Sequence, residues 1–373
     1  ILRRLVGSEM CIRDRYNCRL IRYSKKMGKF LKYSVAIILI VFILIFIALR
    51  IPAVQDRLLN IGLANLINAE SPLTQEDALS AIVCGSRSPL PNPDRAETCI
   101  LVKAGERVFI VDTGDGSASN LRTFGIPFEF EAILITHLHS DHISDLQDFH
   151  LGSWVTGRKS KLKVYGPEGI KTVTNGFEQA YSLDAKYRYE HHGDEVLVEK
   201  AFGYEAITLL ENPEPFYNEN ELKITAFLVE HEPVEPALGF RFDYKGRSLV
   251  ISGDTIYSDN LVKFSKDTDV LFLESLSMDI IGRLQKAQKE IGNDRNAKIM
   301  FDIQDYHISP TDGARLAKEA NAGHLVFYHL APAPVIDLMA TVFTRGVDEI
   351  FSEWTLSDDG TQIILPILSL IHI

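Results

Sequence analysis

The chain has 373 residues, of which 46% are hydrophobic and 24% are charged, and its formal net charge at pH 7 is −11. This length is enough for one large domain or two small ones. The acidic balance argues against broad electrostatic binding to nucleic acid, because phosphate contacts need clustered Lys and Arg side chains. We therefore expect nucleic acid not to be a partner.

The two ends of the chain are unlike the rest. Residues 1–26 and 367–373 resemble translated sequencing-adapter sequence, so we exclude both segments from the fold prediction as non-native. The natural protein is expected to begin at Met27.

Residues 27–50 contain the uncharged apolar run Val35–Leu49, with lysines before it and Arg50 after it. This bias of positive charge predicts a cytoplasmic N-terminus. We interpret 27–50 as an uncleaved signal anchor, that is, one transmembrane helix, and keep a cleaved signal peptide as the alternative. The catalytic part would then be periplasmic or otherwise extracytoplasmic. Residues 51–78 are predicted to form an amphipathic linker.

The globular domain is predicted to span 79–366. Short apolar, β-branched runs predict strands, and they lie at 81–85, 99–102, 108–111, 132–135, 162–165, 222–229, 248–251, 269–274 and 324–330. Cys84 and Cys99 lie on two strands expected to be neighbours. Either a disulfide in an oxidising compartment or two buried thiols fits this arrangement.

Four potential metal ligands occur between the strand at 132–135 and a following helix, in the stretch Thr136–His142. Imidazole nitrogens suit zinc, and a carboxylate suits a second, harder position. The ligand types at this spacing are His137, His139, Asp141 and His142. A strand-to-helix loop lets such side chains converge, so the motif predicts a metal site.

Three further candidates follow predicted strands: His231, Asp254 and His329. For Asp254 the alternative is a helix N-cap, because Asp254, Thr255 and Ser258 can all cap a helix. His324 lies at the start of its strand and is expected at the surface. Ser309, Pro310 and Asp312 form a helix start, with Ser309 as the N-cap.

The His-x-His-x-Asp-His motif at 137–142, followed by His231, Asp254 and His329 in this order, resembles the metallo-β-lactamase fold family. The resemblance implies an α/β fold, a four-layer αββα sandwich, here preceded by the one transmembrane helix. It implies two divalent metal ions, expected to be Zn²⁺ with Mn²⁺ or Fe²⁺ as alternatives. The implied ligands are His137, His139 and His231 for one ion, Asp141, His142 and His329 for the other, and Asp254 for both. Asp112 is expected to support the ligands rather than to bind metal.

Within the family, His307 and the strand ending at His329 resemble the ribonuclease Z and arylsulfatase-like branch. By this resemblance His307 would protonate the leaving group, Glu274 would fix the tautomer of His307, and Asp141 would orient the nucleophile. The alternative for His307 is a capping or packing role. Two departures stand against tRNA processing. Only about twenty residues separate His231 from Asp254, where ribonuclease Z usually inserts a tRNA-gripping arm. The chain also has Leu273-Glu274-Ser275-Leu276 where His-Glu-Ala-Thr is usual.

The resulting prediction is a dinuclear metal-dependent hydrolase of a phosphodiester or sulfate ester, with a metal-bridging hydroxide as the nucleophile. The alternatives are a ribonuclease Z-type tRNA 3′ endonuclease, a lactonase or β-lactamase-like hydrolase, and a degenerate metal-binding module without catalysis. The expected partners are a small-molecule ester substrate, the inner membrane through the N-terminal helix, and a second copy in a homodimer.

Overall fold

The computed structural model describes residues 30–67, 71–209 and 214–367. The chain forms two compact units, residues 1–70 and 71–373. The first contains the helix Phe30–Ala48, which has a mean hydropathy of 2.8 and is not buried, and α2 (Pro52–Ile67). The predicted non-native segment 1–26, and residues 368–373 of the predicted non-native tail 367–373, lie outside the described residues. The boundaries predicted for the anchor, the linker and the domain stay predictions.

The second unit is built on two seven-stranded mixed sheets. The first sheet has the strand order β14-β1-β2-β3-β4-β5-β6 and the second has β13-β12-β11-β10-β9-β8-β7. The strands of the first sheet are β1 (Ala78–Gly85), β2 (Cys99–Ala104), β3 (Arg107–Val111), β4 (Ala132–Leu134), β5 (Leu162–Gly166), β6 (Tyr204–Thr208) and β14 (Gln362–Pro366). The strands of the second are β7 (Tyr217–Glu219), β8 (Leu222–Val229), β9 (Ala237–Tyr244), β10 (Arg247–Ile251), β11 (Val270–Leu276), β12 (His324–Ala331) and β13 (Trp354–Leu356).

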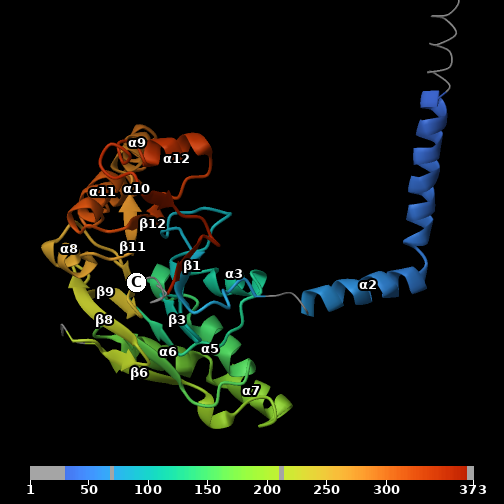
Figure 1. Ribbon diagram of the computed structural model, residues 1–373, viewed down its shortest axis with the longest axis horizontal. Helices are drawn as coiled ribbons and strands as arrows, with labels where there is room; N and C mark the ends of the chain where they lie inside the picture. Colours follow the sequence, from blue (N-terminus) through green and yellow to red (C-terminus); the bar gives the residue numbers. More distant parts are fainter. Residues whose placement is uncertain (1–29, 68–70, 210–213, 368–373) are drawn as a thin grey trace, which may run out of the picture. The chain divides into compact units, whose positions relative to one another are not determined.

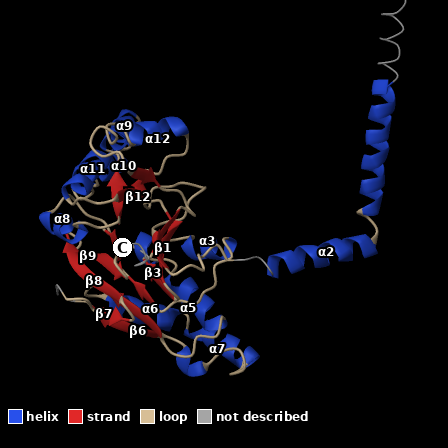
Figure 2. Cartoon of the chain, in the orientation of Figure 1, coloured by secondary structure: helices blue, strands red, loops and turns tan. Residues whose placement is uncertain are grey.

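Helices cover the outer face of each sheet (Figures 1 and 2). The helices between the strands of the first sheet are α3 (Ser117–Thr123), α4 (Ser140–Ile143), α5 (Leu146–Val155), α6 (Ile170–Ala180) and α7 (Ser182–His192). Those of the second half are α8 (Asp259–Ser265), α9 (Met278–Glu290), α10 (Asp294–Asp302), α11 (Pro310–Glu319) and α12 (Asp337–Phe343). The predicted four-layer αββα sandwich is confirmed.

The central strands are apolar almost throughout because both of their faces are buried. Along β3, Phe109 belongs to the core between the two sheets, while Ile110 belongs to the core under the helices of the first sheet. Along β11, Phe272 packs between the sheets and Leu271 packs against the helices of the second. Because successive side chains point to opposite faces of a strand, each of these strands contributes side chains to two hydrophobic cores.

The strand directions bring the candidate ligands to one edge. In the first sheet β3 and β4 are parallel. In the second sheet β10, β11 and β12 are parallel, and β8 shares their direction because it pairs antiparallel with β9, which in turn pairs antiparallel with β10. The carboxyl ends of these strands therefore meet at one rim, where open α/β sheets usually place their ligands.

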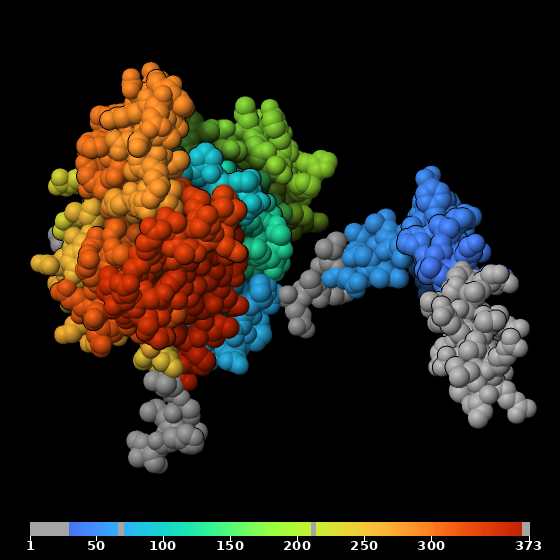
Figure 3. Space-filling model, turned by 90° about the horizontal axis from the view of Figure 1, so that it is seen from above, coloured from blue at the N-terminus to red at the C-terminus, as the bar shows by residue number. Residues whose placement is uncertain are grey.

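The sequence analysis assigned no helix to two parts of the chain that are helical in the structure. Residues 182–192 form the exposed helix α7, and none of its residues lines the cavity described below. Helices α9 and α10 form an antiparallel hairpin between β11 and His307, for which the sequence analysis made no prediction. Figure 3 shows this part of the chain, in orange, standing out from the globular unit.

Two local predictions are settled by side-chain contacts. Ser309 caps α11, because its hydroxyl accepts a hydrogen bond from the Asp312 N–H and Pro310 follows it. Cys84 and Cys99, on the neighbouring strands β1 and β2, form a disulfide. Of the two arrangements left open for these cysteines, the structure has the bonded one.

Candidate metal centre

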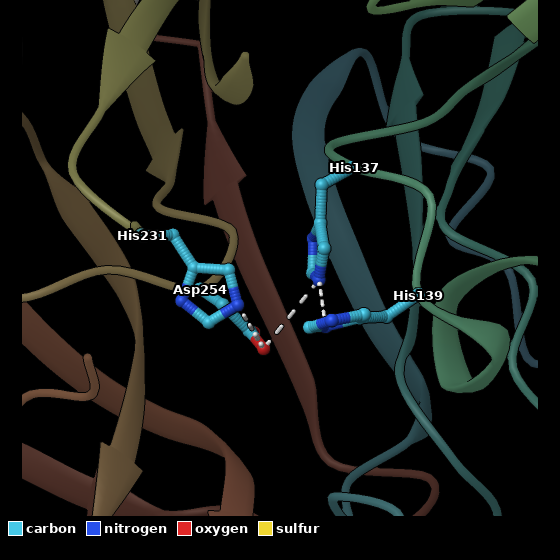
Figure 4. A group of neighbouring side chains, drawn as sticks. All are labelled: His137, His139, His231 and Asp254. Carbon is cyan, nitrogen blue, oxygen red and sulfur yellow. Dashed lines mark hydrogen bonds and ion pairs between the residues drawn. The ribbon is translucent and has the colours of Figure 1, made fainter. Parts of the chain in front are cut away.

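His137 and His139 lie in the loop between β4 and α4. Their Nε2 and Nδ1 atoms are 3.0 Å apart. His231 follows the end of β8, and its Nδ1 donates to the carbonyl of Tyr306 at 2.9 Å. That bond fixes the imidazole tautomer and leaves Nε2 free to face the other two rings. Figure 4 shows the three imidazoles and the carboxylate of Asp254 pointing toward one point.

Asp141, His142 and His329 form a second group beside the first. Asp141 and His142 lie on α4, and His329 lies near the end of β12. The Nε2 atom of His329 is 3.2 Å from Oδ2 of Asp141, and Nε2 of His142 is 3.5 Å from the same oxygen.

Asp254 joins the two groups. Its Oδ2 lies 3.8 Å from Nε2 of His137 and of His231, and 3.3 Å from Nε2 of His329. The proposed alternative, a helix cap, does not hold, because Ser258 caps α8. Gly253 before it has φ +65°, and a Cβ there would lie 2.6 Å from the Leu238 carbonyl oxygen. Glycine thus allows the sharp turn that aims Asp254 into the cluster.

The buried polar atoms of this cluster fit bound metal. Four of them have no hydrogen-bond partner among the described residues: Nε2 of His142, Nε2 of His231, Nδ1 of His329 and Oδ1 of Asp254. Such atoms are costly to bury unless something pairs with them. Two ligand atoms at zinc–ligand distances of 2.0–2.1 Å on a tetrahedral ion stand about 3.3 Å apart, and the separations above scatter around this value. The donor set suits two divalent ions.

Asp112 supports the ligands from behind, as predicted. One oxygen accepts from the Thr136 N–H at 2.8 Å, and the other lies 2.9 Å from Nδ1 of His142. His142 therefore presents Nε2 to the site. Asp112 has φ +60° and His329 has φ +44°. Positive φ is strained for such residues, and strain of this kind gathers at functional sites.

The carboxylates and imidazoles of this cluster shift one another's pKa values. Burial alone would keep His142 neutral, but Asp254, Asp112 and Asp141 together raise its pKa well above the usual value. For His137, burial and the adjoining His142 lower the pKa well below the usual value. Burial opposes ionisation of Asp254, yet His329 and His142 hold its pKa well below the usual range. These shifts keep Asp254 ionised and His137 neutral, the forms in which both can bind a metal ion.

His307 and Glu274 form a pair beside the metal ligands. Nδ1 of His307 lies 2.9 Å from Oε1 of the buried Glu274. Burial disfavours the imidazolium, but Glu274 outweighs it and raises the pKa of His307 to about 9. Oε1 of Glu274 also accepts the N–H groups of Thr255 and Ile308. The carboxylate is therefore held in place, and it orients the imidazole of His307 through Nδ1.

A cavity of about 290 Å³ opens onto this centre. His307, Asp141, Asp254 and His329 line one part of it, and Tyr306 lies next to His307. The remaining wall was missed by the sequence analysis, and its residues are Ser88, Pro89, Leu90, Leu276, Ile299, Ile303 and Ala331. No motif could have found them, because they come from four separate segments. His324 lies elsewhere, bonded to Thr355 at 2.9 Å.

Comparison with known families identifies the class. The model of the metallo-beta-lactamase superfamily matches residues 92–320. Together with the αββα layers and the His/Asp cluster, this places the chain in the metallo-beta-lactamase superfamily. The crystal structure of the metallo-beta-lactamase fold protein YhfI from Bacillus subtilis has a similar fold, with a TM-score of 0.55, 20% identity and coverage of 77% of this chain and 100% of that one.

Within the superfamily the chain is related to ribonuclease Z. It is 32% identical over 259 residues to ribonuclease Z of Mycobacterium bovis (strain BCG / Pasteur 1173P2), covering 68% of this chain and 87% of that protein. The Mycobacterium tuberculosis (strain H37Rv) ribonuclease Z is 30% identical over 259 residues, covering 68% and 86%. The crystal structure of human tRNase Z, short form, shares the fold, with a TM-score of 0.56, 21% identity and coverage of 77% and 100%. These relatives favour the ribonuclease Z alternative over the sulfate ester or small phosphodiester that the sequence analysis put first.

Proposed function

We propose that this chain is a metal-dependent phosphodiesterase that uses ribonuclease Z-type chemistry. The observation that carries the proposal is the His307–Glu274 pair beside two ligand groups that share Asp254. A lactonase or β-lactamase-like reaction gives no comparable use for this pair. A degenerate binding module would have no reason to keep a buried carboxylate behind an imidazole that faces the cavity.

The residues divide the reaction between them. His137, His139 and His231 would hold one ion, Asp141, His142 and His329 the other, and Asp254 both; zinc fits these ligands best. Two such ions supply an activated water and neutralise charge on the phosphoryl oxygens. The water oxygen would add to phosphorus with loss of its proton to solvent, the bond from phosphorus to the leaving oxygen would break, and His307 would give that oxygen a proton. Asp141 would orient the water, and Glu274, which accepts from the Nδ1–H of His307, would stabilise the imidazolium whose second proton, on Nε2, is the one transferred.

The proposal is tested with His307→Asn in the zinc-loaded full chain. Loss of a general acid costs about 10²–10⁴-fold in rate, and it costs most when the leaving group is a poor one. We expect a loss in that range for a diester with an alcohol leaving group and a much smaller loss for bis-p-nitrophenyl phosphate. His324→Asn, a histidine outside the site, is the control. Equal losses on both diesters, or faster turnover of an aryl sulfate or a lactone, would overturn the proposal.

Precursor tRNA is the second substrate candidate. The mycobacterial relatives named ribonuclease Z favour it, and the chain spans most of their length. Accurate cleavage at the tRNA 3′ end by the wild-type chain would establish this function. The net charge of −11 and the short connection between His231 and Asp254, in which β9 and β10 form a hairpin, support the view that RNA is not the substrate.

We also propose that the chain is a membrane-anchored extracytoplasmic enzyme. The helix Phe30–Ala48 is long and apolar enough to cross a bilayer, although a cleaved signal sequence meets the same criterion. The Cys84–Cys99 disulfide supports an oxidising compartment. Cell fractionation, followed by protease treatment of intact spheroplasts, tests both parts. Recovery of the uncut chain in the soluble cytoplasm would contradict them.

A further inference from the structure

One side of the cavity is apolar, and its side chains come from well-separated segments. We call this the apolar wall, and it consists of Leu90, Leu276, Ile299 and Ile303. Leu276 is fully buried and packs with Ile281, Met300 and Ala331, against which Leu90 and Ile303 also pack. Three side chains of the wall, Leu90, Leu276 and Ile303, therefore pack into one core, and Ile299 is the exposed member.

The wall lies directly beside the catalytic groups. Ile303 precedes Tyr306 and His307 on the same segment after α10, and all three line the cavity. Ala331 follows two residues after His329 and lines it as well. A substituent of the reacting phosphorus that extends away from the metal ligands would thus lie against the wall.

Apart from His307 beside the metal ligands, the described wall of the cavity lacks the cationic side chains that a polyanion would need. Among the described residues that line the cavity, none is a lysine or arginine. The guanidinium of Arg87, one position before Ser88, is held by Glu97 at 2.9 Å and by the carbonyls of Ser88 and Arg95. On α10, Lys298 is paired with Asp302. Metal ions can neutralise one phosphate, but further phosphates would stay unpaired.

We propose that the apolar wall is a subsite for an uncharged apolar substituent, so that the substrate is a small phosphodiester carrying an alkyl, acyl or aryl group. This inference rests on the proposed phosphodiesterase function and makes it more specific. The scissile phosphate lies at the metal ligands, and the substituent displaces water from the wall. Burial of each methylene then adds up to about fourfold in affinity.

Binding of phosphate monoesters tests the wall without requiring turnover. Methyl, butyl and hexyl phosphate are titrated calorimetrically into the zinc-loaded, detergent-solubilised full chain, with a detergent blank, and adenosine 3′,5′-bisphosphate is the charged comparison. We expect hexyl phosphate to bind at least about tenfold more tightly than methyl phosphate. An affinity that is flat across the series, or a bisphosphate that binds more tightly than hexyl phosphate, would overturn the inference.

A matched pair of variants on α10 tests whether the tighter binding of hexyl phosphate depends on the apolar wall. Ile299 lines the cavity and is 47% exposed, whereas Phe301 is 58% exposed and does not line it. Ile299→Asp should abolish the gain from methyl to hexyl phosphate, and Phe301→Asp should keep it. Equal behaviour of the two variants would refute the assignment of the wall. If bis-p-nitrophenyl phosphate is not hydrolysed, the proposed reaction fails, while the binding series still decides about the subsite.

Discussion

Single residues around the metal cluster orient its ligands, and Asp112 is one of them. It joins the backbone of Thr136 to the ring of His142, so it couples the loop conformation to the direction of one ligand atom. Asp112 is fully buried, and its carboxylate also accepts from the Thr136 hydroxyl at 2.8 Å. Loss of such a supporting group typically weakens metal binding 10–100-fold.

We therefore predict that Asp112→Ala lowers zinc affinity about 10–100-fold, because His142 is then free to turn or to change tautomer. Competition with a chromophoric chelator measures the affinity. Asp115→Ala, an exposed carboxylate on the same loop, serves as the control and should keep wild-type affinity. Unchanged affinity in Asp112→Ala would show that the backbone alone holds His142.

A second residue-scale prediction concerns Asp145, which lies outside the cluster. Burial raises the pKa of Asp145 to about 6, although the N–H of Ala118 donates to it. Because the pKa is higher in the folded state than in the unfolded state, the folded protein prefers the protonated carboxyl of Asp145. This preference is fully satisfied below the unfolded-state pKa, about 3.9, and the stability is lost as the pH rises through about 6 and the buried group ionises. Asp145→Asn should therefore be more stable than wild type at pH 8, by on the order of 1 kcal/mol, and equal to it below pH 4.

Urea unfolding at the two pH values checks this prediction for Asp145. The side-chain oxygen of asparagine can still accept from Ala118, so the hydrogen bond is kept while the charge is removed. A wild-type protein that is more stable than Asp145→Asn at pH 8 would mean that the ionised carboxylate is stabilising, contrary to the stated sign.

At the scale of elements, a disulfide links two neighbouring strands of the first sheet, β1 and β2. The disulfide between Cys84 and Cys99 ties β1 to β2 at a register shift, where Gly85 rather than Cys84 pairs with Cys99. The loop that it closes includes Ser88–Leu90, which line the cavity. This bond therefore constrains one rim of the site as well as the sheet.

We expect the Cys84→Ala, Cys99→Ala double variant to lose about 3 kcal/mol of stability, the chain-entropy value for a loop of this length. The sequence separation is 15. Urea midpoints with and without reductant provide the measurement. Wild type should shift when reduced, and the double variant should not. A wild-type midpoint that is insensitive to a fully reducing buffer would contradict the prediction.

Over the globular unit as a whole, the metal site belongs to both sheets. Loops of the first sheet carry His137 to His142, and strands of the second lead to His231, Asp254 and His329. Metal binding should therefore hold the two halves together and stabilise the folded chain. The effect is about 4 kcal/mol when free zinc exceeds its dissociation constant a thousandfold.

Chelation of the metal should lower the melting temperature by several degrees, and added zinc should restore it. Scanning calorimetry measures both steps. A His137→Ala, His231→Ala double variant keeps the second ligand group but lacks two ligands of the first, and it should respond less. A melting temperature of the wild-type chain that does not change on chelation would show that metal does not couple the two sheets.

Much of the fold followed from local patterns. The strands at 99–104, 107–111 and 222–229 were predicted within a few residues, because strands buried on both faces are apolar throughout. The ligand candidates were equally visible, since four of them lie in a single loop. The structure brings all the predicted site residues to one rim, whereas their roles as ligands and catalysts stay predictions.

What only the tertiary structure decided is the rest of the cavity. Leu90, Leu276, Ile299 and Ile303 are ordinary apolar residues in sequence, and only folding brings them beside His307. The disulfide was left open for the same reason, because pairing depends on the distance between β1 and β2. Metal ligands can be recognised from local sequence motifs, because the side chains that bind metal are of few and specialised types. A binding wall depends on shape, which arises only when distant segments pack together.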